Sequence, residues 1–399
     1  MSDKTATHRE SVMLSRKFRR IIVKIGSGAL ADTDAGLRVP IIRALAAQVA
    51  KAWEERGIQF VVVTSGAVAA GQKKMGMREK PRTVAMKQAT AAVGQTSLMY
   101  VYERAFEKRG RKVGQLLLTH EDFENRERYN NARNTIEALL SRGIVPIINE
   151  NDTVATEEIR LGDNDHLAAL VTQMIGADLL ILLTDNEGVF TRDPHRFADA
   201  RLIPVIGTID EELLRVASTL RTQAMGTGGM ASKLMAARIV SESGTPVVIG
   251  SGLKRGSIDH ILAGKEVGTL VLPADRGRRN SRKMWIAYAR HPHGTVVVDD
   301  GAVRVLREGG KSLLPAGIVS VQGRFRRGDA VSISDLKGQE FARGITAWSS
   351  KQVEKGKGKK SHEVRSLLGE EIPAEVVHRD DLFIITPHKP PGGRKGAVS

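Results

Sequence analysis

The stretch Ile21-Ile22-Val23-Lys24-Ile25-Gly26-Ser27-Gly28 joins a short apolar strand directly to a loop of small residues. Over residues 39–56, apolar side chains recur at helical spacing, and Gly57 follows where a glycine commonly ends a helix. These residues predict a strand–loop–helix unit in which Lys24 stands at the end of the strand.

The same unit recurs further along the chain. Apolar strands are predicted at residues 60–63, 113–118, 144–148, 179–183 and 246–249. Helices are predicted at residues 83–109, 126–141, 167–175 and 231–244. Short strands that alternate with helices build a mostly parallel, doubly wound sheet with right-handed crossovers, so we expect an α/β fold.

Small and polar residues follow the carboxyl ends of these strands. They are Thr64-Ser65-Gly66, Asn149-Glu150-Asn151-Asp152 and Thr184-Asp185, in addition to the first loop. Ligands of such sheets bind beyond the carboxyl ends of the strands, so we expect these residues to line one crevice. A dinucleotide site is disfavoured because Ala31 stands where the G-x-G-x-x-G pattern needs its third glycine.

A second loop, Gly226-Thr227-Gly228-Gly229-Met230-Ala231-Ser232-Lys233, has the composition of a phosphate site. Glycine backbone can approach an anion closely, and the first turn of a helix favours negative charge. The spacing is not that of a Walker A loop, because the lysine follows Ala-Ser and no Ser or Thr comes next. Taken alone, the loop also fits a flexible surface turn; the polar strand ends upstream favour the phosphate site.

The residues around this crevice suit phosphoryl transfer, in which a protein mainly positions the reactants and neutralises charge on phosphate oxygens. No paired His/Asp or His/Ser arrangement stands out, so the acceptor should need little deprotonation. A carboxylate meets this condition, because its pKa of ~4.3 leaves it ionised at neutral pH. The product would be an acyl phosphate.

Two interpretations are open for Asp163 and Asp165. They could contribute to the crevice, or they could only cap the helix that follows.

From about residue 19 to residue 269 the chain resembles the amino acid kinase superfamily and, within it, the glutamate 5-kinases. The resemblance is carried by residues 23–27, 63–71, 148–152, 162–165 and 226–233. The family usually has Thr where this chain has Ser232, and more often Ser or Thr in place of Gly28. The first change keeps the hydroxyl and the second adds no bulk, so we expect the activity to be kept.

The resemblance implies ATP-dependent phosphorylation of the γ-carboxylate of L-glutamate to glutamyl 5-phosphate, the first step of proline biosynthesis. It implies that Lys24 and Lys233 bind the ATP phosphates, and Asp165 joins them as a catalytic candidate. The rest of the ATP site would be Thr184, Asp185, Thr227, Gly228, Gly229, Met230, Ala231 and Ser232.

On the acceptor side, the resemblance implies that Ser65, Asp152 and Asn164 hold glutamate. We expect Mg²⁺ to accompany ATP, held largely by the phosphates and water, so no metal ligand is assigned.

The chain is predicted to hold two domains between disordered ends. A lead-in at residues 1–17 precedes a kinase domain at 18–275, and a charged linker at 276–293 leads to a second domain at 294–385 and a Pro-, Gly- and Lys-rich tail at 386–399. The second domain is expected to be all-β, with strands at 295–298, 318–321, 330–334 and 341–345. Turns are expected at Asp300-Gly301, Gly328-Asp329 and Lys337-Gly338. Its residues 300–302, 312–317 and 323–329 are similar to a PUA domain, a small barrel-like module.

The composition of the chain indicates which partners and which cellular compartment to expect. The formal charge of the 399 residues is +16, and most of the excess lies beyond residue 276, which suggests a polyanion such as RNA. Arg324, Arg326 and Arg327 fit a solvated face as well as an RNA contact. The sequence has no cysteine and no apolar run long enough to span a membrane, which is typical of a cytoplasmic protein. We also expect a homo-oligomer.

Two other functions stay open at this point. One is a kinase of the same fold for another carboxylate, a carbamate or a nucleotide; residues 149–152 and 162–165 favour an amino acid over these. The other is an RNA-binding or RNA-modifying protein recruited by the C-terminal domain.

Overall fold

The computed structural model describes residues 12–13, 15–32, 36–154, 164–194, 196–219, 229–274, 292–308, 310–369 and 372–385. The chain divides into two compact units, Met1–Arg279 and Asn280–Ser399. Residues 1–11, 276–291 and 386–399 of the predicted lead-in, linker and tail lie outside the described residues.

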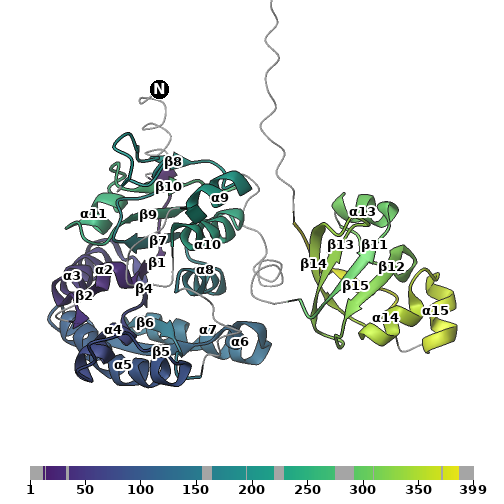
Figure 1. The fold of residues 1–399 in the computed structure, drawn as a ribbon, viewed down its shortest axis with the longest axis horizontal. Helices are drawn as coiled ribbons and strands as arrows, with labels where there is room; N and C mark the ends of the chain where they lie inside the picture. Colours follow the sequence, from purple (N-terminus) through teal and green to yellow (C-terminus); the bar gives the residue numbers. More distant parts are fainter. Residues whose placement is uncertain are drawn as a thin grey trace, which may run out of the picture. The chain divides into compact units, whose positions relative to one another are not determined.

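An eight-stranded sheet forms the centre of the first unit, with helices on both faces (Figure 1). The strand order is β5-β6-β4-β1-β7-β9-β10-β8. All neighbouring strands are parallel except β9 and β10. The strands are β1 (Arg20–Ile25), β4 (Gln59–Thr64), β5 (Val113–Leu118), β6 (Val145–Glu150), β7 (Leu179–Thr184), β8 (Val205–Ile206), β9 (Val247–Ser251) and β10 (Thr269–Val271). The predicted α/β fold is confirmed, with an antiparallel step near one edge.

The alternation of side chains along β1 directs its residues to two different helix layers. Ile21, Val23 and Ile25 belong to the apolar core formed with helices α3 (Val39–Arg56) and α5 (Val84–Glu107). Because side chains alternate across a strand, Lys24 points to the opposite face, where α8 (Asn164–Met174) and α10 (Met230–Glu242) pack together. The pleat of this strand therefore separates the core from the candidate lysine.

Local sequence explains where the main helices begin and end. Gly57 ends α3 with a φ of 67°, a conformation that favours glycine. The side chain of Thr83 caps α5, and the side-chain oxygen of Asn125 caps α7 (Arg126–Ser141) by accepting from two backbone N–H groups of its first turn. The bounds predicted for the first and last of these helices agree with the structure.

Two glycines let helices α4 (Ala67–Lys74) and α5 approach each other closely. A Cβ on Gly94 would lie 1.7 Å from the carbonyl oxygen of Ala67, and a Cβ on Gly71 would lie 1.8 Å from that of Thr90. No larger residue fits either place without separating the helices. This contact fixes α5 against the first turn of α4, which follows β4.

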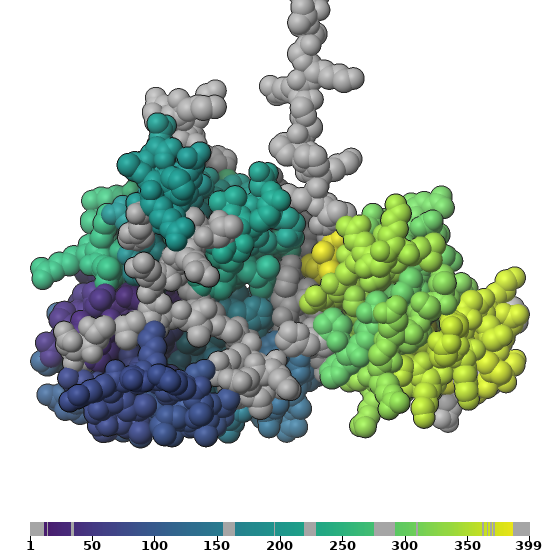
Figure 2. All heavy atoms as spheres, in the orientation of Figure 1, coloured from purple at the N-terminus to yellow at the C-terminus, as the bar shows by residue number. Residues whose placement is uncertain are grey.

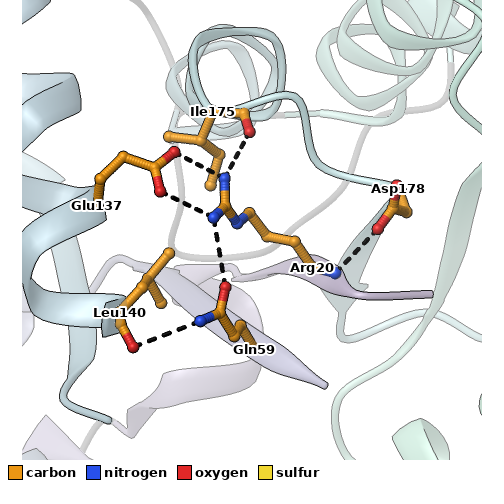
Figure 3. Close-up of polar contacts among 6 residues, drawn as sticks. All are labelled: Arg20, Gln59, Glu137, Leu140, Ile175 and Asp178. Carbon is orange, nitrogen blue, oxygen red and sulfur yellow. Dashed lines mark hydrogen bonds and ion pairs between the residues drawn. The ribbon is translucent and has the colours of Figure 1, made fainter. Parts of the chain in front are cut away.

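Arg20 links several elements at the edge of the sheet where the parallel strands begin. Its side chain points toward Glu137 and the carbonyl of Ile175 (Figure 3). The two terminal guanidinium nitrogens of Arg20 each lie 2.8 Å from a carboxylate oxygen of Glu137, which joins the start of β1 to α7. The backbone N–H of Arg20 donates to Asp178, just before β7. These contacts hold the strand ends opposite to those that carry the candidate residues.

Several short elements were not predicted. They are α2 (Ser27–Leu30), the hairpin β2 (Ala31–Asp32) and β3 (Gly36–Leu37), α6 (His120–Glu124), α9 (Glu211–Thr219), α11 (Ser257–Leu262), and the strands β8 and β10. The side chain of Met13 is 2% exposed and belongs to the core, although it falls within the predicted lead-in. Burial of apolar surface accounts for its placement.

The second unit has its own sheet and its own core. Its strand order is β12-β11-β13-β14-β15, from β11 (Gly294–Val298), β12 (Ile318–Gly323), β13 (Ala330–Ser334), β14 (Glu340–Thr346) and β15 (Val377–Ile384). The first four match the predicted strands, and β15 was not predicted. Trp348 is fully buried in this core, and its indole N–H donates to the carbonyl of Pro373.

The second unit also contains helices, which the all-β expectation did not include. They are α13 (Asp300–Arg307), the 3₁₀ turn η2 (Pro315–Gly317), α14 (Ser350–Gly356) and α15 (Ser361–Leu368). The turn predicted at Asp300-Gly301 is wrong, because Asp299 caps a helix there by accepting from the N–H of Ala302. The buried Leu306 holds this helix on the core.

Within the part of the chain that the structure describes, no helix is long and apolar enough to cross a membrane.

Candidate active site

Lys24, Asp165 and Lys233 meet in the interior of the first unit. The Nζ atom of Lys24 lies 2.5 Å from Oδ1 of Asp165, and the Nζ atom of Lys233 lies 3.1 Å from Oδ2. Three elements supply the three residues: the central strand β1 and the first turns of α8 and α10. The two lysines, far apart in the sequence, thus share one carboxylate.

This cluster is almost completely shielded from water. The exposed fractions are 1% for Lys24, 0% for Asp165 and 5% for Lys233. Because buried charges are unfavourable unless paired, the carboxylate stabilises both ammonium groups in place. The three formal charges leave one net positive charge, so the cluster can attract an anion such as phosphate. Asp165 lies within the first turn of α8, and its carboxylate pairs with both lysines.

The start of α10 adds a hydroxyl to the cluster. The Oγ atom of Ser232 lies 3.2 Å from Oδ2 of Asp165 and 2.8 Å from the carbonyl oxygen of Gly229. Gly229 is the N-cap of α10, which begins at Met230 and includes Ala231. The predicted ATP-site residues Thr227 and Gly228 lie outside the described residues.

The other predicted ATP-site residues follow β7. The hydroxyl of Thr184 donates to Oδ1 of Asp185 over 2.7 Å. A Cβ on Gly28 would lie 2.9 Å from Oδ2 of Asp185, so the first loop makes room for this carboxylate. At the neighbouring strand ends, the N–H of Gly26 donates to the carbonyl of Leu183. The end of β7 and the first loop are thus adjacent, as expected if both line one crevice.

The predicted substrate residues Ser65 and Asn164 are in direct contact. Nδ2 of Asn164 donates to Oγ of Ser65 over 3.0 Å, which joins the first turn of α8 to the loop after β4. Gly66 has a φ of 104°, so this tight turn requires a glycine. Asp152 is half-buried in the turn after β6.

A contact between two side-chain amides, at the end of β6 and on α5, could not be predicted from the sequence of either segment alone. Nδ2 of Asn149, at the end of β6, donates to Oε1 of Gln95 on α5 over 2.8 Å. Gln95 lies seven residues before Tyr102, hence on the same helical face, which turns toward the sheet. Only the helical periodicity around Tyr102 could have pointed to it.

Tyr102 itself supports the end of β4. Its OH lies 2.8 Å from Oγ1 of Thr64, and its side chain is fully buried. Burial raises the pKa of the Tyr102 phenol above its usual value, and the hydrogen bond with Thr64 acts in the opposite direction. The phenol therefore stays neutral as a structural group.

Chemically, this arrangement can hold a phosphate chain at two cations and place an acceptor beside Ser65 and Asn164. Among the described residues, no group of three or more His, Asp or Glu side chains is arranged to hold a metal ion.

Two protein-family models match parts of this chain. Residues 19–251 match the model of the amino acid kinase family, and residues 294–368 match that of the PUA domain. The chain is 45% identical to a glutamate 5-kinase from Pelobacter propionicus, over 93% of this chain and 99% of that protein. It is 47% identical to one from Citrifermentans bemidjiense, with the same coverage, and 44% identical to one from Caldanaerobacter subterraneus, over 94% of this chain and all of that protein.

Among solved structures, the chain is similar to UMP kinase from Bacillus anthracis, with a TM-score of 0.44 and 16% identity over 64% of this chain and 97% of that one.

Proposed function

The chain belongs to the amino acid kinase family, and from this premise we propose that it transfers the γ-phosphoryl group of ATP to the γ-carboxylate of L-glutamate. The product is glutamyl 5-phosphate, which enters proline biosynthesis. The observation that supports this most is the buried cluster in which Lys24 and Lys233 share Asp165, next to the Ser65–Asn164 contact. Relatives that this chain matches over 99% of their length are named glutamate 5-kinase.

In this mechanism the two lysines stabilise the negative charge that shifts along the phosphoryl group during transfer. Asp165 acts as a positioning residue, because it fixes both ammonium groups before the substrate arrives. Glutamate needs no base, since its γ-carboxylate is already ionised at neutral pH. The acid–base groups of a hydroxyl kinase are therefore not required.

ATP and Mg²⁺ are both part of the proposal. Thr184, Asp185 and the start of α10 would hold the nucleotide, and Ser232 would steady the loop through Gly229. Mg²⁺ would neutralise charge on the phosphates. Its protein contacts would be few, because the carboxylate of Asp165 is engaged by two lysines.

The acceptor side of the site makes a separate expectation testable. Asn164→Ala and Asp152→Asn should raise the KM for glutamate much more than the KM for ATP, because both residues are assigned to the amino acid. Equal effects on both KM values would mean that assigning these two residues to the glutamate half of the crevice is wrong.

The central experiment is ADP release by the purified full chain with a panel of amino acids, with and without added RNA. We expect release that depends on L-glutamate, and the same release without RNA. Release that instead depends on another carboxylate, a carbamate or a nucleotide would contradict the proposed substrate. Release that depends on RNA alone would support an RNA-directed function of the C-terminal unit.

A further inference from the structure

Tyr102 is a fully buried phenol that the mechanism above does not use. It lies on α5 within the apolar core of the first unit, and its side chain is 0% exposed. A phenylalanine would fill nearly the same space without a polar atom. Because a hydroxyl loses its hydrogen bonds to water on burial, a core keeps one at little cost only where it has a partner. Here that partner is Thr64, at the end of β4.

The pleat of β4 explains how these two side chains meet. Phe60 and Val62 belong to the core that packs against α5, and Thr64 shares their face because side chains alternate along a strand. The outer face of α5 carries Tyr100, which is 62% exposed, and this helix is visible in dark blue at the lower left of Figure 2. Tyr102 lies on the inward face, as its contact with Thr64 requires.

Two hydrogen bonds connect Tyr102 to the Ser65 loop, which consists of Ser65 and Gly66 between β4 and α4. The hydroxyl of Tyr102 lies 2.8 Å from Oγ1 of Thr64, and Oγ1 of Thr64 donates to the carbonyl oxygen of Ser65 over 3.1 Å. A hydroxyl carries one hydrogen, so Thr64, which donates its own to Ser65, must accept from Tyr102. The hydrogen bonds therefore run in one direction, from the phenol through Thr64 to the backbone of the loop.

The Ser65 carbonyl belongs to the peptide unit that turns the chain into α4. The next residue, Gly66, has a φ of 104°, so the orientation of this peptide decides where the chain turns. The Oγ atom of Ser65 accepts from Nδ2 of Asn164. On the neighbouring strand β1, Lys24 is paired with Val63, two residues before Ser65. A fixed peptide after Ser65 therefore fixes the Ser65 hydroxyl relative to both Asn164 and the lysine.

We propose that Tyr102 is a positioning residue of the phosphoryl transfer. Through Thr64 it holds the peptide between Ser65 and Gly66, and so sets the orientation in which the Ser65 hydroxyl meets glutamate. The inference rests on the proposed function, in which Ser65 holds the amino acid. Tyr102 acts through Thr64 because its own hydroxyl is enclosed in the core, where a hydrogen bond is stronger than in water.

The first test removes one hydroxyl at a time. Tyr102→Phe and Thr64→Val keep the shape of the side chain and lose the hydroxyl. For each variant we expect the KM for L-glutamate to rise about 3- to 10-fold, the factor that corresponds to one net hydrogen bond. The kcat and the KM for ATP should stay within about twofold. Thr64→Ser keeps the hydroxyl that both accepts and donates, so its KM for L-glutamate should stay within about twofold of the wild-type value.

A double variant separates positioning from stability. Thr64→Val leaves the Tyr102 hydroxyl buried without its partner, which lowers the free energy of unfolding. In the double variant Thr64→Val/Tyr102→Phe both polar groups are gone, so urea unfolding should show a higher stability than in Thr64→Val alone. The KM for L-glutamate should nevertheless stay raised by about the same factor as in the single variants, because all three variants break the same connection.

Tyr100→Phe is the matched control, because it removes a phenol hydroxyl from the exposed face of the same helix. It should leave both KM values unchanged. If the wild-type chain does not phosphorylate L-glutamate, the proposed function fails and the inference falls with it. If the wild-type chain does so, an unchanged KM for L-glutamate in Tyr102→Phe, or an equal rise in both KM values, overturns the inference alone. A KM that returns to the wild-type value in the double variant would also overturn it, because the KM would then follow stability.

Discussion

Lys24 and Lys233 come from different elements and share the carboxylate of Asp165, so each should matter to turnover. We predict that Lys233→Met, which removes the charge and keeps the length, lowers kcat by about 100-fold or more. The KM for glutamate should change little, because the lysine acts on the phosphate. Steady-state kinetics on the folded variant is the measurement, and Lys24→Met should behave alike.

The exposed Lys51 on α3 offers the matched control for both lysines. Lys51→Met should keep the wild-type kcat. A folded Lys233→Met variant with near-normal turnover would remove Lys233 from the mechanism.

Tyr102 carries a prediction about pH. Burial raises the pKa of its phenol above the ordinary value of ~10. The unfolded chain therefore loses this proton at lower pH than the folded chain, and stability is lost as pH rises above ~10, by up to about 1.4 kcal/mol per pH unit. We predict that the free energy of unfolding of Tyr102→Phe falls less steeply between about pH 9 and pH 11 than that of the wild type.

Urea unfolding at a series of pH values measures this difference. Tyr100→Phe is the control, because Tyr100 is 62% exposed. Its pH dependence should match that of the wild type, and parallel curves for Tyr102→Phe and the wild type would show that the phenol ionises alike in both states.

At the scale of elements, the packing of α4 on α5 carries the next prediction. A Cβ on Gly94 would lie 1.7 Å from the Ala67 carbonyl oxygen, so Gly94→Ala must push the helices apart. We predict a loss of about 1–3 kcal/mol in the free energy of unfolding, with a raised KM for glutamate because α4 follows the Ser65 loop. Chemical denaturation checks the first effect and kinetics the second.

Gly207→Ala is the control for this substitution, because a Cβ there meets no atom of the described residues within 4 Å. It should leave stability nearly unchanged. A Gly94→Ala variant as stable as the wild type would show that the two helices can separate at little cost.

Elements with strong local signals were predicted from the sequence, and elements set by tertiary contacts were not. The helix Arg126–Ser141 has a capping Asn125 and regular apolar spacing, so its bounds were predictable. The three-residue β10 pairs antiparallel with β9 and depends on neighbours distant in sequence. A turn was predicted at Asp300-Gly301 because Asp followed by Gly is typical of turns, but these two residues form the first turn of α13, which Asp299 caps.

The candidate site follows the same division. Lys24, Asp165 and Lys233 lie in recognisable motifs, and the structure brings them together. Gln95 lies in the middle of a long helix, where a polar residue usually faces water, and only the contact with Asn149 shows its position.

At the scale of the whole molecule, the two units have separate sheets and separate cores. We predict that a chain truncated after Asp275 folds and keeps glutamate-dependent phosphoryl transfer. The reason is that all the residues proposed to act on ATP or glutamate, from Lys24 to Lys233, precede that point. Circular dichroism measures whether the truncated chain folds, and ADP release measures its phosphoryl transfer. An insoluble or inactive truncated chain beside an active full-length one would show that the C-terminal unit completes the kinase.

RNA binding by the C-terminal unit is a separate question for the full chain. If Arg324, Arg326 and Arg327 contact phosphates, affinity for RNA should fall steeply as salt is added. Substituting all three by Ser should then lower the salt dependence together with the affinity. Binding that does not respond to salt would leave these arginines as a solvated face.

The meeting of Lys24, Asp165 and Lys233 also bears on how the chain refolds. The Asp165 and Lys233 positions are 68 residues apart in the chain, and Lys24 lies still further from both. Local helices form early in folding, whereas contacts between distant segments must wait for closure of the long loops between them. After dilution from denaturant, kinase activity should therefore recover later than helical circular dichroism, and the lag should report the docking of α8 and α10 on the central strand.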